Sequence, residues 1–122
     1  MIGKKTSSAR IDAVQISLKH AKILCNELNK KRVGRAKTLL EDLIANKKSL
    51  DGKYYTSASK KILEILKSAE ANAMAKGLNT EQLFVSVAKA DKGRTFIRPK
   101  SRFKSRGRRM KSTNVEIILE ER

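Results

Sequence analysis

Apolar residues in the first two thirds of the chain recur every three or four positions, which is the spacing of amphipathic helices. Three such stripes predict three helices. The first is capped by Ser17 and ends near position 29, and the second covers about residues 33–46. The third begins at position 56 or 57 and stops at Gly77, a residue type favoured at helix C-termini.

Later in the chain the apolar period changes from that of a helix to that of a strand. Leu83, Val85 and Val87 alternate with other side chains, and residues 115–120 show the same period of two. A short first strand is predicted over residues 9–16. The two later strands bracket residues 92–111, so the simplest connection between them is a long antiparallel hairpin.

These elements predict an α+β fold in the order β-α-α-α-β-β. We expect one domain over residues 1–122, with a small antiparallel three-stranded sheet, three helices on one face, and a long protruding β-hairpin arm. The globular body should comprise residues 9–91 and 112–121, after a frayed basic start, and the arm residues 92–111. An isolated two-stranded ribbon is marginal in water, so the distal arm should become ordered only with its partner.

Composition narrows the kind of partner. The chain has 122 residues, 39% hydrophobic and 34% charged, with a formal net charge of +17. Such an excess of positive charge normally marks a polyanionic partner, first nucleic acid and second an anionic membrane surface. One cysteine and one histidine give no disulfide and no metal site within the chain, and fit a reduced intracellular compartment. No apolar run approaches the roughly 20 residues of a membrane span.

The arm contains ten Lys or Arg residues and no acidic residue. From Arg98 to Arg108 the positive charges occupy every second position, which places them along one edge of an extended strand at steps of roughly 6.6 Å. If the hairpin turns within this run, the stripe meets two surfaces of a polyanion instead of one. The alternative is a solvated basic tail. The arm residues predicted to bind nucleic acid are Lys92, Arg94, Arg98, Lys100, Arg102, Lys104, Arg106, Arg108, Arg109 and Lys111.

Two further groups of polar residues are candidates for phosphate binding. The start of the first helix offers free N–H groups and a positive dipole end beside Ser17, Lys19, His20 and Lys22. The link between the first two helices carries Lys31, Arg32 and Arg35, next to Lys30. Either group is alternatively an ordinary solvated face. No catalytic triad, phosphate loop or acid/base pair is recognisable, so no catalytic activity is expected.

Four stretches in their order along the chain resemble ribosomal large-subunit protein twenty-two. They are Ile16 to Lys22, Ala69 to Leu78 with its Ala-Glu-Ala-Asn-Ala core, Arg98-Pro99-Lys100, and Asn114 to Glu121. The resemblance implies an α/β body that binds large-subunit ribosomal RNA near the exit of the nascent-peptide tunnel, and a β-hairpin that lines the tunnel wall. It matches Ser17, Lys19, His20 and Lys22 to the family's RNA contacts at the helix start.

The implied partners are ribosomal RNA, neighbouring large-subunit proteins and the nascent polypeptide, in the cytoplasmic ribosome. No cofactor, metal, membrane or homo-oligomer is expected. Two alternatives from other classes are a free-standing nucleic-acid chaperone and a basic protein of membrane surfaces. The second would need large apolar helix faces for the membrane, whereas here the apolar stripes are needed for the core.

Overall fold

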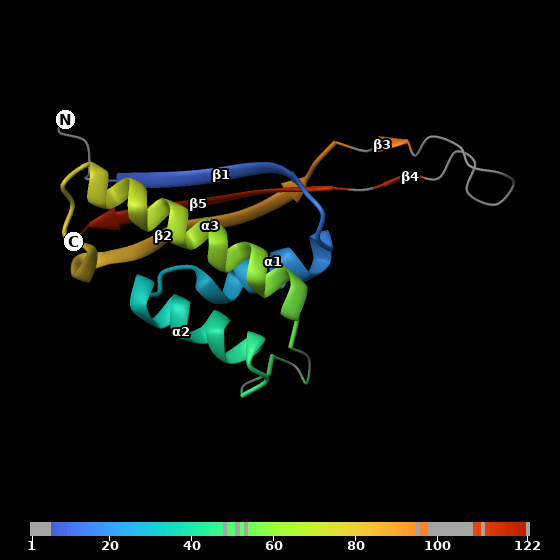
Figure 1. The fold of residues 1–122 in the computed structure, drawn as a ribbon, viewed down its shortest axis with the longest axis horizontal. Coiled ribbons are helices and arrows are strands. Elements are labelled where there is room, and N and C mark those ends of the chain that lie inside the picture. Colours follow the sequence, from blue (N-terminus) through green and yellow to red (C-terminus); the bar gives the residue numbers. More distant parts are fainter. Residues whose placement is uncertain are drawn as a thin grey trace, which may run out of the picture.

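A three-stranded antiparallel sheet carries the helices on one of its faces (Figure 1). The structure, a computed structural model, describes residues 6–47, 49–50, 52, 54–94, 96–97, 109–110 and 112–121. The sheet order is β1 (Thr6–Val14), β5 (Thr113–Glu121) and β2 (Leu83–Lys92), so the last strand lies in the centre. The predicted fold class is therefore confirmed.

The three predicted helices form close to their expected bounds, as α1 (Leu18–Leu28), α2 (Val33–Ile44) and α3 (Thr56–Ala75). Ser17 caps α1, because its hydroxyl oxygen accepts the N–H of His20 at 3.4 Å. Gly77, with φ 78°, ends α3 and lets the N–H of Leu78 bond the carbonyl of Ala73 at 3.0 Å. A short 3-10 turn, η1 (Thr80–Gln82), then leads into β2.

The core lies between the sheet and the helices. α1 and α3 pack directly on the strands, while α2 packs mainly against α3 (Figure 1). The apolar stripes of all three helices supply buried side chains, among them Leu24, Leu40, Ile62 and Leu66, all fully buried. Each such side chain contributes about 1.5–3 kcal/mol relative to an exposed one. These contacts use the apolar faces of the helices for the core of this one body.

β1 starts earlier than the predicted position 9. Thr6–Val14 forms the strand, and Ser7 is buried where its hydroxyl donates to the carbonyl of Ala69 in α3 at 3.0 Å. That close approach depends on Ala69 and Ala73, both fully buried small residues. The prediction that residues 6–8 belong to a frayed start was wrong, because long-range pairing with β5 orders a polar segment that lacks a local pattern of its own.

β2 contains a bulge that the alternation did not predict. Its register with β5 shifts between Val85 and Val87, so Val85 is buried while Val87 is 39% exposed. After the bulge the inward positions are Ala88 and Ala90. The expected equivalence of Leu83, Val85 and Val87 was therefore wrong, because one extra residue moves every later side chain to the opposite face.

The predicted hairpin is present. β2 and β5 pair antiparallel as far as Lys92 and Thr113, and β3 (Phe96–Ile97) pairs with β4 (Arg109–Met110) beyond them. β3 and β4 extend past the ends of β2 and β5, away from the helices (Figure 1). Most of the alternating basic run lies outside the described residues. The arrangement of its side chains along one strand edge, and the ordering of the arm by a partner, therefore stay predictions.

Each outer edge of the sheet is capped by the chain itself at the end far from the arm. Along β2, the N–H of Lys30 bonds the carbonyl of Val85, and the N–H of Val85 bonds the carbonyl of Lys31, each at 2.7 Å. Along β1, the carbonyls of Thr6 and Ser8 accept the side chains of Lys76 and Asn72 from α3, at 3.0 and 2.8 Å. These contacts occupy backbone groups that would otherwise template pairing with another chain.

Candidate nucleic-acid interface

The base of the arm meets the start of α1 at a shallow hollow of about 430 Å³. The hydroxyl of Thr113 in β5 donates to the carbonyl of Ile16 at 3.0 Å and so ties the strand to the residue before the helix cap. We call this site the arm-base hollow. The residues that line it are Ile16, Ser17, Leu18, Lys19, Lys92, Ser112 and Thr113.

The arm-base hollow is electropositive. Lys19 and Lys92 come from distant parts of the sequence and are both exposed. The first turn of α1 contains no acidic residue, and none of the residues described around the hollow is acidic. The unpaired N–H groups and positive dipole end of a helix add to the lysine charges. Together these groups form a site suited to a phosphate.

The other two candidates at the helix start differ in exposure. Lys22 is exposed on α1, whereas His20 is half-buried and packs its ring edge-on against Tyr55, with ring centroids 4.8 Å apart. Tyr55 has the left-handed φ of 48°, just before α3. Part of the imidazole is thus used to join α1 to the start of α3. Lys22 is the more accessible of the two for a phosphate.

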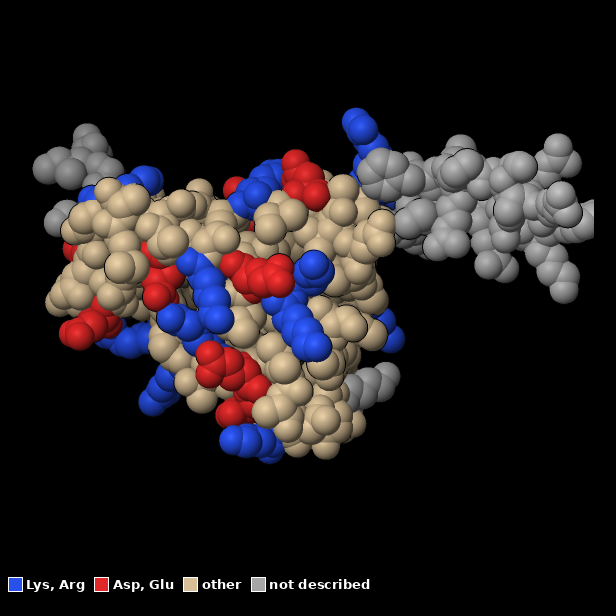
Figure 2. All heavy atoms as spheres, viewed as in Figure 1, with Lys and Arg blue, Asp and Glu red and all other residues tan. Residues whose placement is uncertain are grey.

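The link between α1 and α2 is a mixed surface. Lys31 and Arg35 line one hollow together with Asp42, and Arg32 and Arg35 line another together with Glu70 and Glu81. Lys31 also lies 3.7 Å from Glu27. In Figure 2 the basic and acidic groups lie side by side over the helices. The structure therefore gathers the predicted residues, but among carboxylates that weaken the attraction for phosphate.

A half-buried ion pair was not anticipated from the sequence. The ammonium of Lys37 lies 2.7 Å from Glu70 and joins α2 to α3. The two residues are far apart in the chain, so no local spacing could have indicated the pair. Lys37 is accordingly committed to the fold rather than to a partner.

The two described basic residues at the base of the arm, Lys92 and Arg94, lie in different hollows. Lys92 lines the arm-base hollow, whereas Arg94 lines a different hollow with Asp12, Ala13 and Asn114. The hydroxyl of Ser112 bonds the carbonyl of Arg94. Of Arg109 the structure describes only the backbone, in β4. The other predicted arm contacts lie outside the described residues; they are Arg98, Lys100, Arg102, Lys104, Arg106, Arg108 and Lys111.

Several features bear on other functions. Burial raises the pKa of the Cys25 thiol to about 11, which leaves it protonated and unreactive at neutral pH. Within the described residues no cluster of three or more His, Cys, Asp or Glu could hold a metal ion. In that same part of the chain, no helix combines the length and apolar character required to cross a membrane.

Residues 9–120 match the sequence model of the family described as ribosomal protein L22p/L17e. The chain belongs to this family. The resemblance seen in the sequence is thus confirmed. Members of the L22p/L17e family are structural proteins of the large ribosomal subunit and not enzymes, so the predicted absence of catalytic activity is also confirmed.

Curated archaeal relatives support the L22p/L17e assignment over the whole chain. Large ribosomal subunit protein uL22 of Methanocaldococcus jannaschii is 32% identical over an alignment of 139 positions, which covers 97% of this chain and 89% of the relative. The same protein of Archaeoglobus fulgidus is 31% identical, covering 97% and 90%. Both alignments are longer than this chain of 122 residues, so these relatives carry residues that it lacks.

Proposed function

We propose that this L22p/L17e family member binds large-subunit ribosomal RNA through its basic body and its hairpin arm, and that the arm lines the nascent-peptide tunnel. The body contacts are Ser17, Lys19, His20, Lys22, Lys31, Arg32 and Arg35, and the arm contacts run from Lys92 to Lys111. Family membership supports the ribosomal setting, and the residue contacts are our inference from charge and geometry.

The arm-base hollow is the observation that carries this proposal. It combines two exposed lysines with a helix N-terminus, and the residues described around it are free of carboxylates. It also sits where the arm leaves the body. A phosphate bound there fixes the direction in which the arm enters the RNA, because Ser112 and Thr113 belong to both the hollow and the hairpin base.

The mechanism is charge neutralisation combined with shape. Lysine and arginine side chains replace condensed counterions around the RNA, and the released ions provide the entropy of binding. If about eight phosphates are neutralised, log affinity for a free RNA fragment should fall against log salt with a slope of roughly −6 to −7. The body anchors the complex, and the arm extends the contact between RNA segments.

Salt titration with a large-subunit rRNA fragment tests the arm. Replacing Arg102, Lys104 and Arg106 by Ala should make the slope less steep by about 2–3, since each neutralised phosphate contributes about 0.7–0.9. A matched control replaces three exposed lysines of α3, at positions 60, 61 and 67, which should leave the slope near that of the wild type. Equal slopes for the arm variant and the wild type would refute phosphate contact by the arm.

A second pair of variants tests the body. The double variant Lys19→Ala, Lys92→Ala should bind RNA more weakly, and its slope of log affinity against log salt should be less steep by about 1–2. The control Lys60→Ala, Lys67→Ala should change neither quantity. For the tunnel, stalled nascent chains carrying a photoreactive side chain should crosslink to residues 98–108. Crosslinks confined to other tunnel components would remove the tunnel-lining part and leave RNA binding standing.

A further inference from the structure

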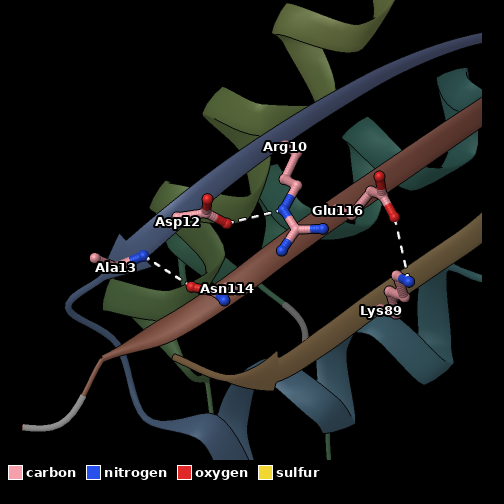
Figure 3. A network of polar contacts seen from close by, with 6 residues as sticks. All are labelled: Arg10, Asp12, Ala13, Lys89, Asn114 and Glu116. Carbon is pink, nitrogen blue, oxygen red and sulfur yellow. Dashed lines mark hydrogen bonds and ion pairs between the residues drawn. The ribbon is translucent and has the colours of Figure 1, made fainter. Parts of the chain in front are cut away.

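The face of the sheet that points away from the helices is uncovered by any other described element. Figure 3 shows part of it, with the helices behind the strands. We call it the open sheet face. The alternation of buried and outward side chains defines its members between Val87 and the arm: Ser8, Arg10 and Asp12 on β1, Asn114, Glu116 and Ile118 on β5, and Val87, Lys89 and Asp91 on β2. Phe84 and Glu120 continue the face at its other end, where both are buried, and are not part of the open region.

The charge of the open sheet face differs from that of the rest of the molecule. The chain as a whole carries +17, yet here the carboxylates of Asp12, Asp91 and Glu116 outnumber Arg10 and Lys89. Arg94 adds a charge only at the arm end, in its hollow beside Asp12. Counting Arg94, three cations balance these three carboxylates, so this face lacks the excess positive charge that attracts a phosphate backbone, and RNA is a poor ligand for it.

Both cations on the face are already engaged by its own acids. The guanidinium of Arg10 donates to Oδ1 of Asp12 at 2.8 Å, and the ammonium of Lys89 lies 3.3 Å from Oε1 of Glu116 (Figure 3). These contacts use one oxygen of each carboxylate, and an ionised carboxylate offers about four acceptor sites. A guanidinium or ammonium group from a partner can therefore add to the network, whereas an anion would have to break it.

The middle of the face is apolar. Val87 pairs with Ile118 across β2 and β5, and Val87 is 39% exposed because of the bulge. An apolar centre bordered by charged groups is the anatomy of a protein interface. Each sheet edge is capped at the end far from the arm, by α3 side chains on β1 and by the α1–α2 link on β2, which favours a partner lying across the face over one that adds a strand.

We propose that the open sheet face docks a lysine- and arginine-rich segment of a neighbouring protein, with an apolar side chain of that segment over Val87 and Ile118. This rests on the proposed function, since the assembled large subunit brings such a neighbour close. A second copy of this chain fits poorly, because the cations of the face are already paired with its own carboxylates and leave no surplus positive charge for those of the copy. The molecule thus presents basic surfaces to RNA and its charge-balanced sheet face to protein.

Photocrosslinking in assembled large subunits tests this assignment. The photoreactive amino acid p-benzoylphenylalanine replaces Val87 in one variant and Lys22 on α1 in another. The Val87 probe should give a protease-sensitive, ribonuclease-resistant adduct that mass spectrometry maps to a basic segment of another protein. Adding Glu116→Lys should lower its yield about tenfold, while the matched change Glu64→Lys, exposed on α3, should not.

The Lys22 probe separates this inference from the proposed function. Suppose that the Lys22 probe gives an rRNA adduct. The docking inference alone would then be overturned if the Val87 probe gave no adduct, or an adduct to rRNA, to a second copy of this chain or to an acidic segment. Absence of rRNA adducts at Lys22 in the same subunits would instead count against RNA binding by the body. A basic-protein adduct at Val87 that is insensitive to Glu116→Lys would refute the electrostatic part of the argument.

Discussion

Gly93→Ala should destabilise the protein, although replacing glycine by alanine stabilises positions where alanine fits without strain. Gly93 does not have a left-handed φ, so an alanine backbone is allowed there. Its Cβ, however, would lie 2.7 Å from Oδ1 of Asn114, 2.8 Å from the hydroxyl of Ser112 and 3.2 Å from the carbonyl carbon of Ser112. The two side chains would have to move, and the backbone contact would remain.

The size of the effect follows from what those side chains hold. Asn114 accepts the N–H of Ala13 at 3.0 Å, and Ser112 bonds the carbonyl of Arg94. Losing one or both hydrogen bonds costs about 0.5–1.5 kcal/mol each, and crowding adds about 1–3 kcal/mol. Alanine also lowers the conformational entropy of the unfolded chain, which offsets about 0.4–1 kcal/mol of this loss. We expect a net loss of about 1–5 kcal/mol.

Thermal and urea unfolding followed by circular dichroism measure this difference. The melting temperature should fall by about 4 °C for each kcal/mol at this chain length. The matched control is Gly34→Ala in α2, where an added Cβ meets no atom within 4 Å. That variant should be stabilised by about 0.5–1 kcal/mol, because alanine is the better helix former.

A double-mutant cycle identifies the cause. In an Asn114→Ala background the nearest obstructing atom is gone, so Gly93→Ala should cost about 1 kcal/mol less than in the wild type. Costs that add to within about 0.3 kcal/mol would show that the two positions do not interact. If the Gly93→Ala and Gly34→Ala variants had equal free energies of unfolding, the steric argument would be refuted altogether.

Three further outcomes are expected. Deleting residues 96–110 should leave the helical circular dichroism of the body intact, because the core described for the body is built from α1, α2, α3, β2 and β5; loss of helix would contradict a separate arm. Ala13→Gly should raise stability by about 0.5–1 kcal/mol in urea unfolding, because Ala13 has a φ of 60°, whereas the control Ala71→Gly on exposed α3 should lower it. Cys25 should react with a thiol reagent at pH 8 only after unfolding. Because its pKa rises to about 11 on folding, the wild type should lose stability between about pH 9 and 11 as the unfolded thiol ionises, a slope that Cys25→Ala lacks.

The sequence predicted the helices well because helix signals are local. Ser17 and Gly77 act within a few residues of themselves, and the apolar stripes need only neighbouring turns. Strand details were less accessible. The early start of β1 and the bulge before Val87 depend on pairing with β5, whose residues are about 30–115 positions away in the chain.

For the candidate site, the sequence identified the basic residues but could not rank them. Lys19 lies at the start of α1 and Lys92 at the end of β2, and only the fold places them in one hollow whose described lining has no carboxylate. Arg32 and Arg35 looked equivalent in composition, yet folding surrounds them with Asp42, Glu70 and Glu81. Charge is a property of composition, whereas the local field depends on which groups the fold brings together.

By itself, the sequence determined the net positive charge, the family, the three helices and the hairpin connection, because each follows from composition or from short-range order. The tertiary structure alone decided the central place of β5, the bulge in β2, the capped sheet edges and the balance of charge on the open sheet face. All four arise from contacts between segments far apart in the chain. The free energy of such contacts depends on the folded backbone as a whole, which no local pattern encodes.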